Sequence, residues 1–107
     1  MTLPMKFSII TPTYKRASLL ERAVQSVVRQ TYANWEMIIS NDSPDDPSYK
    51  TFLSSERDSR IRYYVNDMNR GVNYSRNFAL DNVAKDSDWV VFFWMTMIIL
   101  HPMHSKS

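Results

Sequence analysis

Three side chains in this sequence carry chemistry suited to a nucleotide, and each follows a short apolar run. Tyr14 offers an aromatic face on which a nucleobase can stack. Asp42 offers a carboxylate that can accept the N–H of a pyrimidine edge. Arg76 carries a forked set of guanidinium donors that suits a phosphate. Together the three residue types predict a nucleotide site, provided that the fold brings them to one place.

Each of these residues also has a structural alternative. Tyr14 could simply cover the edge of a sheet, and Asp42 could cap a turn. Arg76 could pair with Asp81 or with Asp86 in the same stretch of chain. Deciding between the two interpretations requires the elements that position the side chains.

Apolar runs alternate with helical patterns along the chain, which predicts an α/β fold. Four strands are expected, at residues 7–10, 35–40, 61–65 and 88–93. Helices are expected between them, at residues 17–30, around Tyr49 and at residues 74–84. This alternation predicts a mostly parallel sheet with flanking helices. Ligands of such sheets bind beyond the C-terminal ends of the strands, so the site is expected in the loops after Ile10, Ser40, Val65 and Phe93.

The first expected helix has the clearest pattern. Its apolar residues recur at helical spacing and form one stripe, comprising Leu20, Ala23, Val24, Val27 and Val28. Ser18 and Glu21 have the spacing of a capping box, in which each side chain satisfies a free backbone N–H at the start of the helix. This pair predicts that the side chains of Ser18 and Glu21 cap the start of the helix.

Length and composition exclude several classes of protein. A chain of 107 residues allows one small domain, and a formal net charge of +2 with mixed signs offers no basic surface for nucleic acid. The absence of cysteine excludes disulfides and thiolate metal sites. The N-terminus has no secretory signal, and the apolar run Trp89–Leu100 is shorter than the roughly 20 residues that a membrane-spanning helix needs. No transmembrane segment and a cytoplasmic location are therefore expected.

The single glycine, Gly71, excludes two nucleotide motifs. A dinucleotide fingerprint needs three glycines in the first strand–helix turn, and a P-loop needs two and a lysine. The turn TPTYKRAS contains none. Hydride transfer by a Rossmann enzyme and P-loop hydrolysis are thus disfavoured.

The residues from Met5 to Phe93 resemble the N-terminal half of the inverting family-2 glycosyltransferases of GT-A fold. The likeness rests on four features in the order and spacing of the family. These are a strand ending in Pro-Thr-Tyr, a helix ending in Gln-Thr-Tyr, an acidic turn after the second strand, and the segment NRGVNYSRN. The resemblance implies a Rossmann-like nucleotide-binding half that is incomplete at the C-terminus.

In that family this half binds the nucleotide of a sugar-nucleotide donor. By position, the resemblance implies that Pro12, Thr13 and Tyr14 line the nucleoside pocket, that Asp42 bonds the base, and that Arg76 lies near the base or the diphosphate. A UDP-sugar is the expected donor. The family usually has two aspartates and a glycine after the second strand.

This sequence departs from that pattern at two positions. Asn41 replaces the first aspartate and Ser43 the glycine. Because Asn41 lacks the charge of the usual aspartate, the contacts to the ribose and the base differ, and the identity of the donor stays open.

The family also has an Asp-x-Asp motif after the fourth strand, which holds Mg²⁺ or Mn²⁺ against the diphosphate. Carboxylate oxygens suit these cations. Here Phe93 is followed by WMTM, and no carboxylate follows it, so the metal ligands expected of the complete enzyme are missing. His101 and His104 are interpreted as incidental. The resemblance therefore assigns neither catalytic nor metal-binding residues to this chain.

The genetic code suggests why the motif is missing. Trp and Met have single codons, so Trp94–Met97 is encoded as TGG ATG ACN ATG. With one nucleotide restored before Trp94, the triplets encode Leu, Met or Val, then Asp, Asp, a variable position and Asp. We therefore expect residues 1–93 to be a partial glycosyltransferase-like domain and residues 94–107 to be an out-of-frame tail. The alternative is a native apolar tail, because DNA rich in ATG often yields GAT when it is shifted.

The sequence thus predicts the donor-binding half of an enzyme that transfers a sugar from a nucleotide diphosphate to an acceptor hydroxyl, inactive as it stands. The complete enzyme is expected in the cytoplasm, with peripheral attachment to the membrane as an alternative. Two other hypotheses remain open. One is a non-catalytic nucleotide-binding fragment, and the other is a module that self-associates through Trp89–Leu100.

Overall fold

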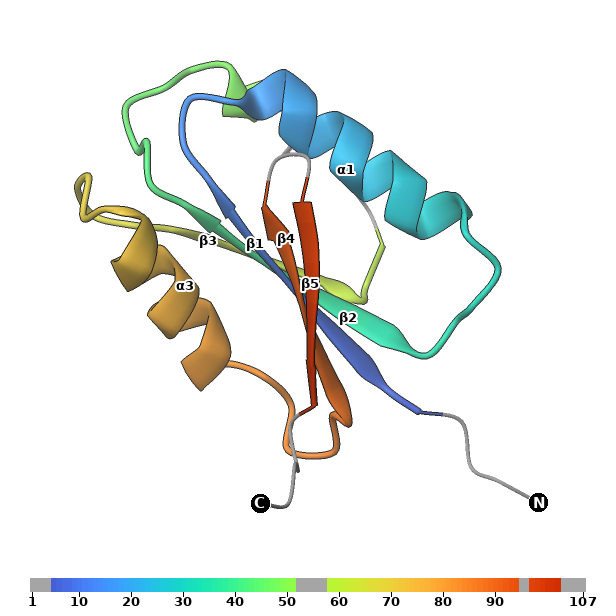
Figure 1. Ribbon diagram of the computed structural model, residues 1–107. Helices are drawn as coiled ribbons and strands as arrows, with labels where there is room; N and C mark the ends of the chain where they lie inside the picture. The colour runs from blue at the N-terminus through green and yellow to red at the C-terminus, as the bar shows by residue number, and fades with distance from the viewer. Residues whose placement is uncertain (1–4, 52–57, 95–96, 103–107) are drawn as a thin grey trace.

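The structure is a computed structural model that describes residues 5–51, 58–94 and 97–102. A five-stranded sheet in the order β3-β2-β1-β4-β5 forms its centre (Figure 1). The strands are β1 (Phe7–Thr13), β2 (Trp35–Asn41), β3 (Ile61–Val65), β4 (Trp89–Trp94) and β5 (Met97–Pro102). The first four are mutually parallel and β5 is antiparallel to β4. This arrangement confirms the predicted α/β class with a mostly parallel sheet.

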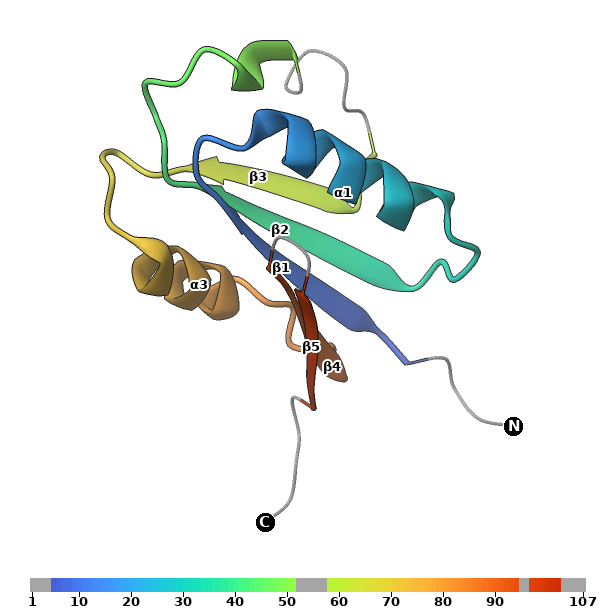
Figure 2. The same ribbon diagram turned by 45° about the horizontal axis from the view of Figure 1, so that its top comes forward.

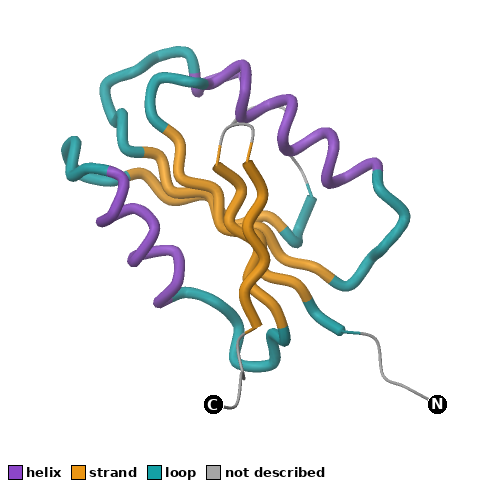
Figure 3. The backbone as a smooth tube through the Cα atoms, in the orientation of Figure 1, coloured by secondary structure: helices purple, strands orange, loops and turns teal. Residues whose placement is uncertain are grey.

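Two helices cover opposite faces of the sheet. Helix α1 (Ala17–Arg29) follows β1, and helix α3 (Val72–Asp81) connects β3 to β4. Figures 2 and 3 show α1 and α3 on either side of the strands. Residues 49–51 are also helical, as expected around Tyr49. Among the described residues, no helix is long and apolar enough to cross a membrane.

The sheet reverses its winding direction beside β1. The strands β1, β2 and β3 follow one another in one direction, whereas β4 lies on the other side of β1. β1 pairs with β2 as far as Thr13↔Asn41 but with β4 only as far as Ile10↔Phe92. Beyond Ile10 the strands β1 and β4 therefore separate, and such a switch point is where ligands of open α/β sheets bind.

Alternation along the strands divides the core into two clusters. Ile9 of β1 packs with Leu20, Val24 and Val27 on the α1 face. Ile10 packs with Ile38, Ala79 and Val90 on the α3 face. The predicted apolar stripe of α1 is confirmed, because its members are buried except for Val28, which is partly buried against the same cluster.

The predicted capping box is wrong. α1 begins at Ala17, Arg16 precedes it, and no side chain caps its N-terminus. The N–H of Leu20 already donates to the carbonyl of Arg16 at 2.9 Å, so Ser18 lies within the first turn. The helix starts early because side chains distant in sequence hold the preceding turn, as described below.

The apolar run at the C-terminus is divided into two strands. β4 and β5 form an antiparallel hairpin in which Trp94 pairs with Met97 and Trp89 with Pro102. β4 is thus an inner strand, and β5 occupies the edge of the sheet. The backbone of β4 is therefore paired on both sides, by β1 and by β5, while residues 103–107 lie outside the described part of the chain.

A buried carboxylate joins the strands to the α3–β4 connection at the other end of the sheet. Glu36 of β2 is 7% exposed and accepts hydrogen bonds from Ser8 Oγ at 2.6 Å and Ala84 N at 2.8 Å. Arg62 of β3 forms an ion pair with the same carboxylate at 2.6 Å. Burial favours a raised pKa for Glu36, but these donors outweigh it and hold the pKa below its ordinary value.

Candidate functional site

A cavity of about 350 Å³ lies at the switch point between β1 and β4. The cavity is lined by Thr11–Tyr14, at the end of β1 and in the turn after it, and by Phe93 of β4. One part of the remaining wall is polar, with Asp42, Asn69, Gly71 and Ser75. The other part is apolar, with Leu19, Leu20, Ala23 and Val72. A wall with one polar and one apolar side suits a flat ring that also carries hydrogen-bonding edges.

The turn after β1 places Tyr14 and Arg16 at the mouth of this cavity. Lys15 adopts a left-handed conformation with φ 51°, an uncommon backbone for a residue other than glycine. Ser43 Oγ accepts the N–H of Lys15 at 3.1 Å, and the hydroxyl of Tyr49 accepts the N–H of Arg16 at 3.1 Å. Both partners come from the segment after β2, so the turn is held from outside.

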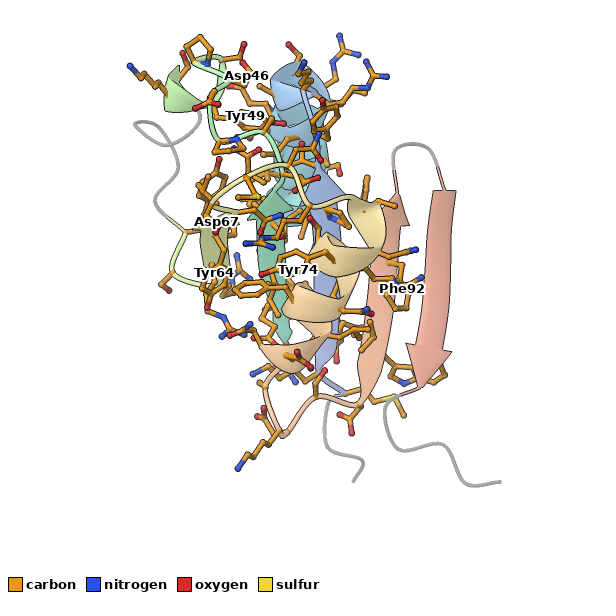
Figure 4. The ribbon with its side chains drawn as sticks, turned by 90° about the vertical axis from the view of Figure 1, so that its left-hand side faces the viewer. Asp46, Tyr49, Tyr64, Asp67, Tyr74 and Phe92 are labelled. Atoms are coloured by element: carbon orange, nitrogen blue, oxygen red, sulfur yellow. The ribbon has the colours of Figure 1, made fainter. Side chains whose placement is uncertain are left out.

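Tyr49 is the more deeply buried of the two partners. Its side chain is 2% exposed, and its hydroxyl also lies 2.7 Å from Thr13 Oγ1. Figure 4 shows Tyr49 beside the acidic turn that contains Asp46, at the end of the sheet where the cavity opens. Tyr14 remains 44% exposed, with Lys15 Nζ 5.4 Å from the centre of its ring. The aromatic face is thus presented on a fixed turn.

Asp42 lines the cavity, but its carboxylate is largely engaged by the protein. It is 4% exposed and accepts Asn66 Nδ2 at 2.8 Å and the backbone N–H of Arg70 at 2.7 Å on Oδ1. Oδ2 accepts the N–H of Gly71 at 2.8 Å. The alternative that Asp42 caps a turn therefore describes part of its role, because it holds the segment before α3.

The two departures from the acidic-turn pattern are both buried. Asn41 Oδ1 accepts the N–H and the hydroxyl of Ser43, each at 2.8 Å, and Asn41 Nδ2 donates to the hydroxyl of Tyr63 at 2.8 Å. Neither Asn41 nor Ser43 belongs to the cavity wall. Asn41 orients Ser43, which in turn accepts the N–H of Lys15. These two residues shape the Tyr14 turn and do not contact the cavity.

Arg76 is the one sequence-predicted site residue outside the cavity wall. It is exposed on α3, one residue beyond Ser75, which is buried and lines the cavity. Among the described residues Arg76 forms neither of the expected pairs, since Asp86 pairs with Lys6 at 3.2 Å. The structure therefore brings Pro12, Thr13, Tyr14 and Asp42 together and leaves Arg76 outside the cavity wall.

Several lining residues were not assigned from the sequence. Asn69 and Gly71 belong to the segment NRGVNYSRN that carries the family resemblance, so their spacing was an available signal. Gly71 has a φ of 90°, which only glycine adopts readily. Ser75 lies in the same segment. Arg16 and Phe93 line the cavity through tertiary packing that no local pattern indicates.

The residues present do not fit a divalent metal. Within the described part of the chain, no group of three His, Asp, Glu or Cys side chains could hold an ion. The residues that follow Phe93 in sequence offer tryptophan, methionine and threonine in place of carboxylates. Hard cations prefer carboxylate oxygens, which these residues lack.

Comparison with known proteins finds a matching family and several relatives. Residues 8–93 match the model of the family described as glycosyl transferase family 2. A protein of Escherichia coli K12 named for glycosyl transfer in colanic acid biosynthesis is 43% identical over 68% of this chain and 26% of its own. The E. coli enzyme WfgD, named as a UDP-Glc:α-D-GlcNAc-diphosphoundecaprenol β-1,3-glucosyltransferase, is 39% identical over 68% of this chain and 28% of its own.

A solved structure shares the fold. The crystal structure of residues 1–349 of TarS from S. aureus in complex with UDP superposes with a TM-score of 0.71 at 23% identity, over 83% of this chain and 27% of that one. The present chain thus spans about a quarter of the length of the proteins that it matches.

Proposed function

Since the chain belongs to glycosyl transferase family 2, we propose that the cavity between β1, β4 and the segment before α3 holds the nucleotide of a nucleotide-sugar donor. The observation that carries the proposal is the position of Tyr14 and Asp42 on two different loops at one cavity of the switch point. In this arrangement the Tyr14 ring stacks on the base, and Asp42 accepts an N–H from its edge.

Arg76 has a more distant part in this proposal. It is exposed, follows the lining residue Ser75 and is unpaired among the described residues, so its long side chain is available to a phosphate that extends out of the cavity. Arg16 lines the mouth of the cavity and is exposed as well. Pro12 and Thr13 complete the nucleoside wall. A UDP-sugar is the donor that we favour, because one relative is named for UDP-Glc and the solved neighbour is titled with UDP.

The whole protein would transfer the sugar of this donor to an acceptor hydroxyl. The name of WfgD specifies an acceptor on diphosphoundecaprenol, a lipid carrier. We infer the same class of acceptor here, which agrees with a cytoplasmic enzyme that works at the membrane surface. The general base and the Mg²⁺ or Mn²⁺ ligands lie outside the described residues of this chain in this proposal. The chain by itself binds the donor nucleotide without transferring the sugar.

Titration of the full chain with UDP by calorimetry tests the proposal. Tyr14→Ala is expected to weaken binding by about 1–3 kcal/mol, as the loss of one base–aromatic stack does. Tyr32→Ala is the matched control, because Tyr32 is similarly exposed but contacts Phe7 at the opposite end of β1. No heat of binding by the wild-type chain, or equal affinity for UDP in Tyr14→Ala and wild type, rules out the assignment.

Self-association is a second candidate function, favoured by the position of β5. This strand is the edge of the sheet, and its residues Met97–Leu100 carry no charge that would discourage pairing with a second copy. Light scattering should show a dimer that Ile99→Lys dissociates. Val65→Lys on β3, the opposite edge, should leave the dimer intact. A monomer at all concentrations excludes this candidate.

A further inference from the structure

One buried side chain next to the cavity has no role in the site described so far. Asn66, the first residue after β3, is 7% exposed and is fixed by four hydrogen bonds. Its N–H donates to the carbonyl of Asn41 at 2.8 Å, and its Oδ1 accepts the Ser40 hydroxyl at 3.4 Å. Its Nδ2 donates to Asp42 Oδ1 at 2.8 Å and to Ser75 Oγ at 2.9 Å. Asn66 thus joins the end of β2 to α3.

The orientation of this amide is determined by its neighbours. An ionised carboxylate can only accept hydrogen bonds, so the group that faces Asp42 must be the NH₂ of Asn66. Both of its N–H donors are then used, one on Asp42 and one on Ser75. The carbonyl oxygen is left for Ser40. No other assignment of the amide satisfies all three contacts.

We propose that Asn66 is a positioning residue of the nucleotide site, whose neutral amide fixes the Asp42 carboxylate toward the cavity and holds Asn69–Gly71 beside it. A carboxylate has about four acceptor positions. Three are taken on Asp42, by Asn66 Nδ2 and by the N–H groups of Arg70 and Gly71. One position remains for a base, and its direction is set by the other three. The inference rests on the function proposed above.

The neutrality of residue 66 is the testable part of this inference. Asn66→Asp has nearly the same shape but places a second carboxylate within hydrogen-bonding distance of Asp42. Two carboxylates at this distance cannot both be ionised without repulsion, so the pKa of one is raised. Below that pKa a shared proton replaces the N–H donor, and the geometry is restored. Above it the two groups repel and the segment before α3 is displaced.

The charged groups around this pair are few. Asp67 and Arg70 lie in the same segment and pair with each other at 2.7 Å. Tyr63 of β3 is bonded to Asn41, and Arg76 is exposed on α3. From β1 the contact with Asp42 is the carbonyl of Thr13, which accepts the Asp42 N–H at 2.8 Å. Arg70 is thus the described cation whose charge also acts on Asp42, and it is engaged by Asp67 first.

Asn77→Asp is a matched control. It adds the same charge at an exposed position of α3 that lies outside the cavity wall. An exposed carboxylate is ionised throughout the range from about pH 5 to about pH 8. Asn77→Asp is therefore expected to bind UDP as the wild type does at every pH.

The experiment measures UDP affinity and urea unfolding of the full chain between about pH 5 and about pH 8. At about pH 8, Asn66→Asp should bind UDP at least about tenfold more weakly than wild type. At about pH 5 its UDP affinity should return toward that of wild type. Because the pKa of the new pair is raised in the folded state, its stability relative to wild type should fall as the pH rises. A packing defect alone would give a loss that does not depend on pH.

The outcomes separate this inference from the proposed function. If the wild-type chain does not bind UDP, the proposed function fails, and the pH profile of unfolding still decides whether Asn66 orients Asp42. Equal pH profiles of Asn66→Asp and Asn77→Asp overturn the inference. If Asn66→Asp does not fold, Asn66→Ala replaces it, and unchanged UDP affinity in that variant overturns the inference as well.

Discussion

At the scale of single residues, buried hydroxyl groups hold the turn that carries Tyr14 at the cavity. The hydroxyl of Tyr49 accepts the N–H of Arg16 and lies within hydrogen-bonding distance of Thr13. It therefore connects the end of β1 to the start of α1 at the point where Tyr14 leaves the sheet. The unusual backbone of Lys15 persists because both sides of the turn are fixed.

Removing this hydroxyl should be costly. We expect Tyr49→Phe to lower the free energy of unfolding by about 1–3 kcal/mol, because it leaves the Arg16 N–H and the Thr13 hydroxyl without a partner in a buried site. UDP affinity should fall in parallel, because the turn that carries Tyr14 loosens. Urea denaturation and calorimetry measure the two effects.

Tyr64→Phe is the control for this substitution. Tyr64 is partly buried against Phe78, at a ring distance of 5.2 Å, and lies outside the cavity wall. Figure 4 shows it near Tyr74, away from Tyr49. Its loss of a hydroxyl should change the stability by less than about 0.5 kcal/mol. Equal effects in both variants would mean that the Tyr49 hydroxyl has no special role.

At the scale of elements, the two ends of the sheet have different tasks. The C-terminal ends of β1 and β2 carry the site, whereas the opposite end is held by the buried Glu36. Its carboxylate joins β2 to Ser8 of β1, Arg62 of β3 and Ala84 before β4. One group thus fixes the register of three parallel strands and the connection from α3.

This carboxylate should make the stability depend on pH. The pKa of Glu36 is lower in the folded chain than in the unfolded one, so its contribution is present above the ordinary carboxyl range near pH 4.3. The contribution is lost as the pH falls through the lower folded pKa. Urea denaturation between about pH 7 and about pH 3 should show this loss.

Glu36→Gln should remove that part of the pH dependence. It should also cost about 1–3 kcal/mol at neutral pH, because Arg62 loses its charged partner. Glu21→Gln, at an exposed position of α1, is the matched control and should keep the wild-type profile. If Glu36→Gln retains the full acid sensitivity, the stabilising carboxylate lies elsewhere.

At the scale of the whole molecule, the C-terminal hairpin is the feature that the family does not explain. The family match ends at residue 93, and β5 follows from Met97 to Pro102. The hairpin shows that the backbone of this segment can pair with β4. It does not test the out-of-frame origin of residues 94–107, which stays a prediction.

Sequencing the coding DNA from the Phe93 codon to well beyond the Ser107 codon tests that prediction. We expect the frame shifted by one nucleotide to stay open through an aspartate cluster and into further α/β sequence. The restored protein should then transfer sugar from a nucleotide donor in the presence of Mn²⁺, since carboxylates would follow β4. Stop codons soon after the cluster in the shifted frame would instead show that the apolar tail is native.

The sequence by itself determined the first four strands and the helices between them, but not β5. The stripe of α1 from Leu20 to Val28 is a local pattern with the helical period of 3.6 residues. β2 is a buried, mostly apolar run, and turn residues separate such elements. The family segments also placed Pro12–Tyr14 and Asp42 at one edge of the sheet. The strands of a parallel sheet end on the same side, so this much follows from their order.

Only the tertiary structure decided which side chains meet. It joined Asp42 to Gly71, Tyr49 to Arg16 and Asn66 to Ser75, and it placed Arg76 outside the cavity wall. It also replaced the expected capping box by a turn held from the segment after β2. Hydrogen bonds between residues far apart in the chain leave no periodic trace in the sequence. Their geometry exists only once the sheet has brought the ends of its strands together.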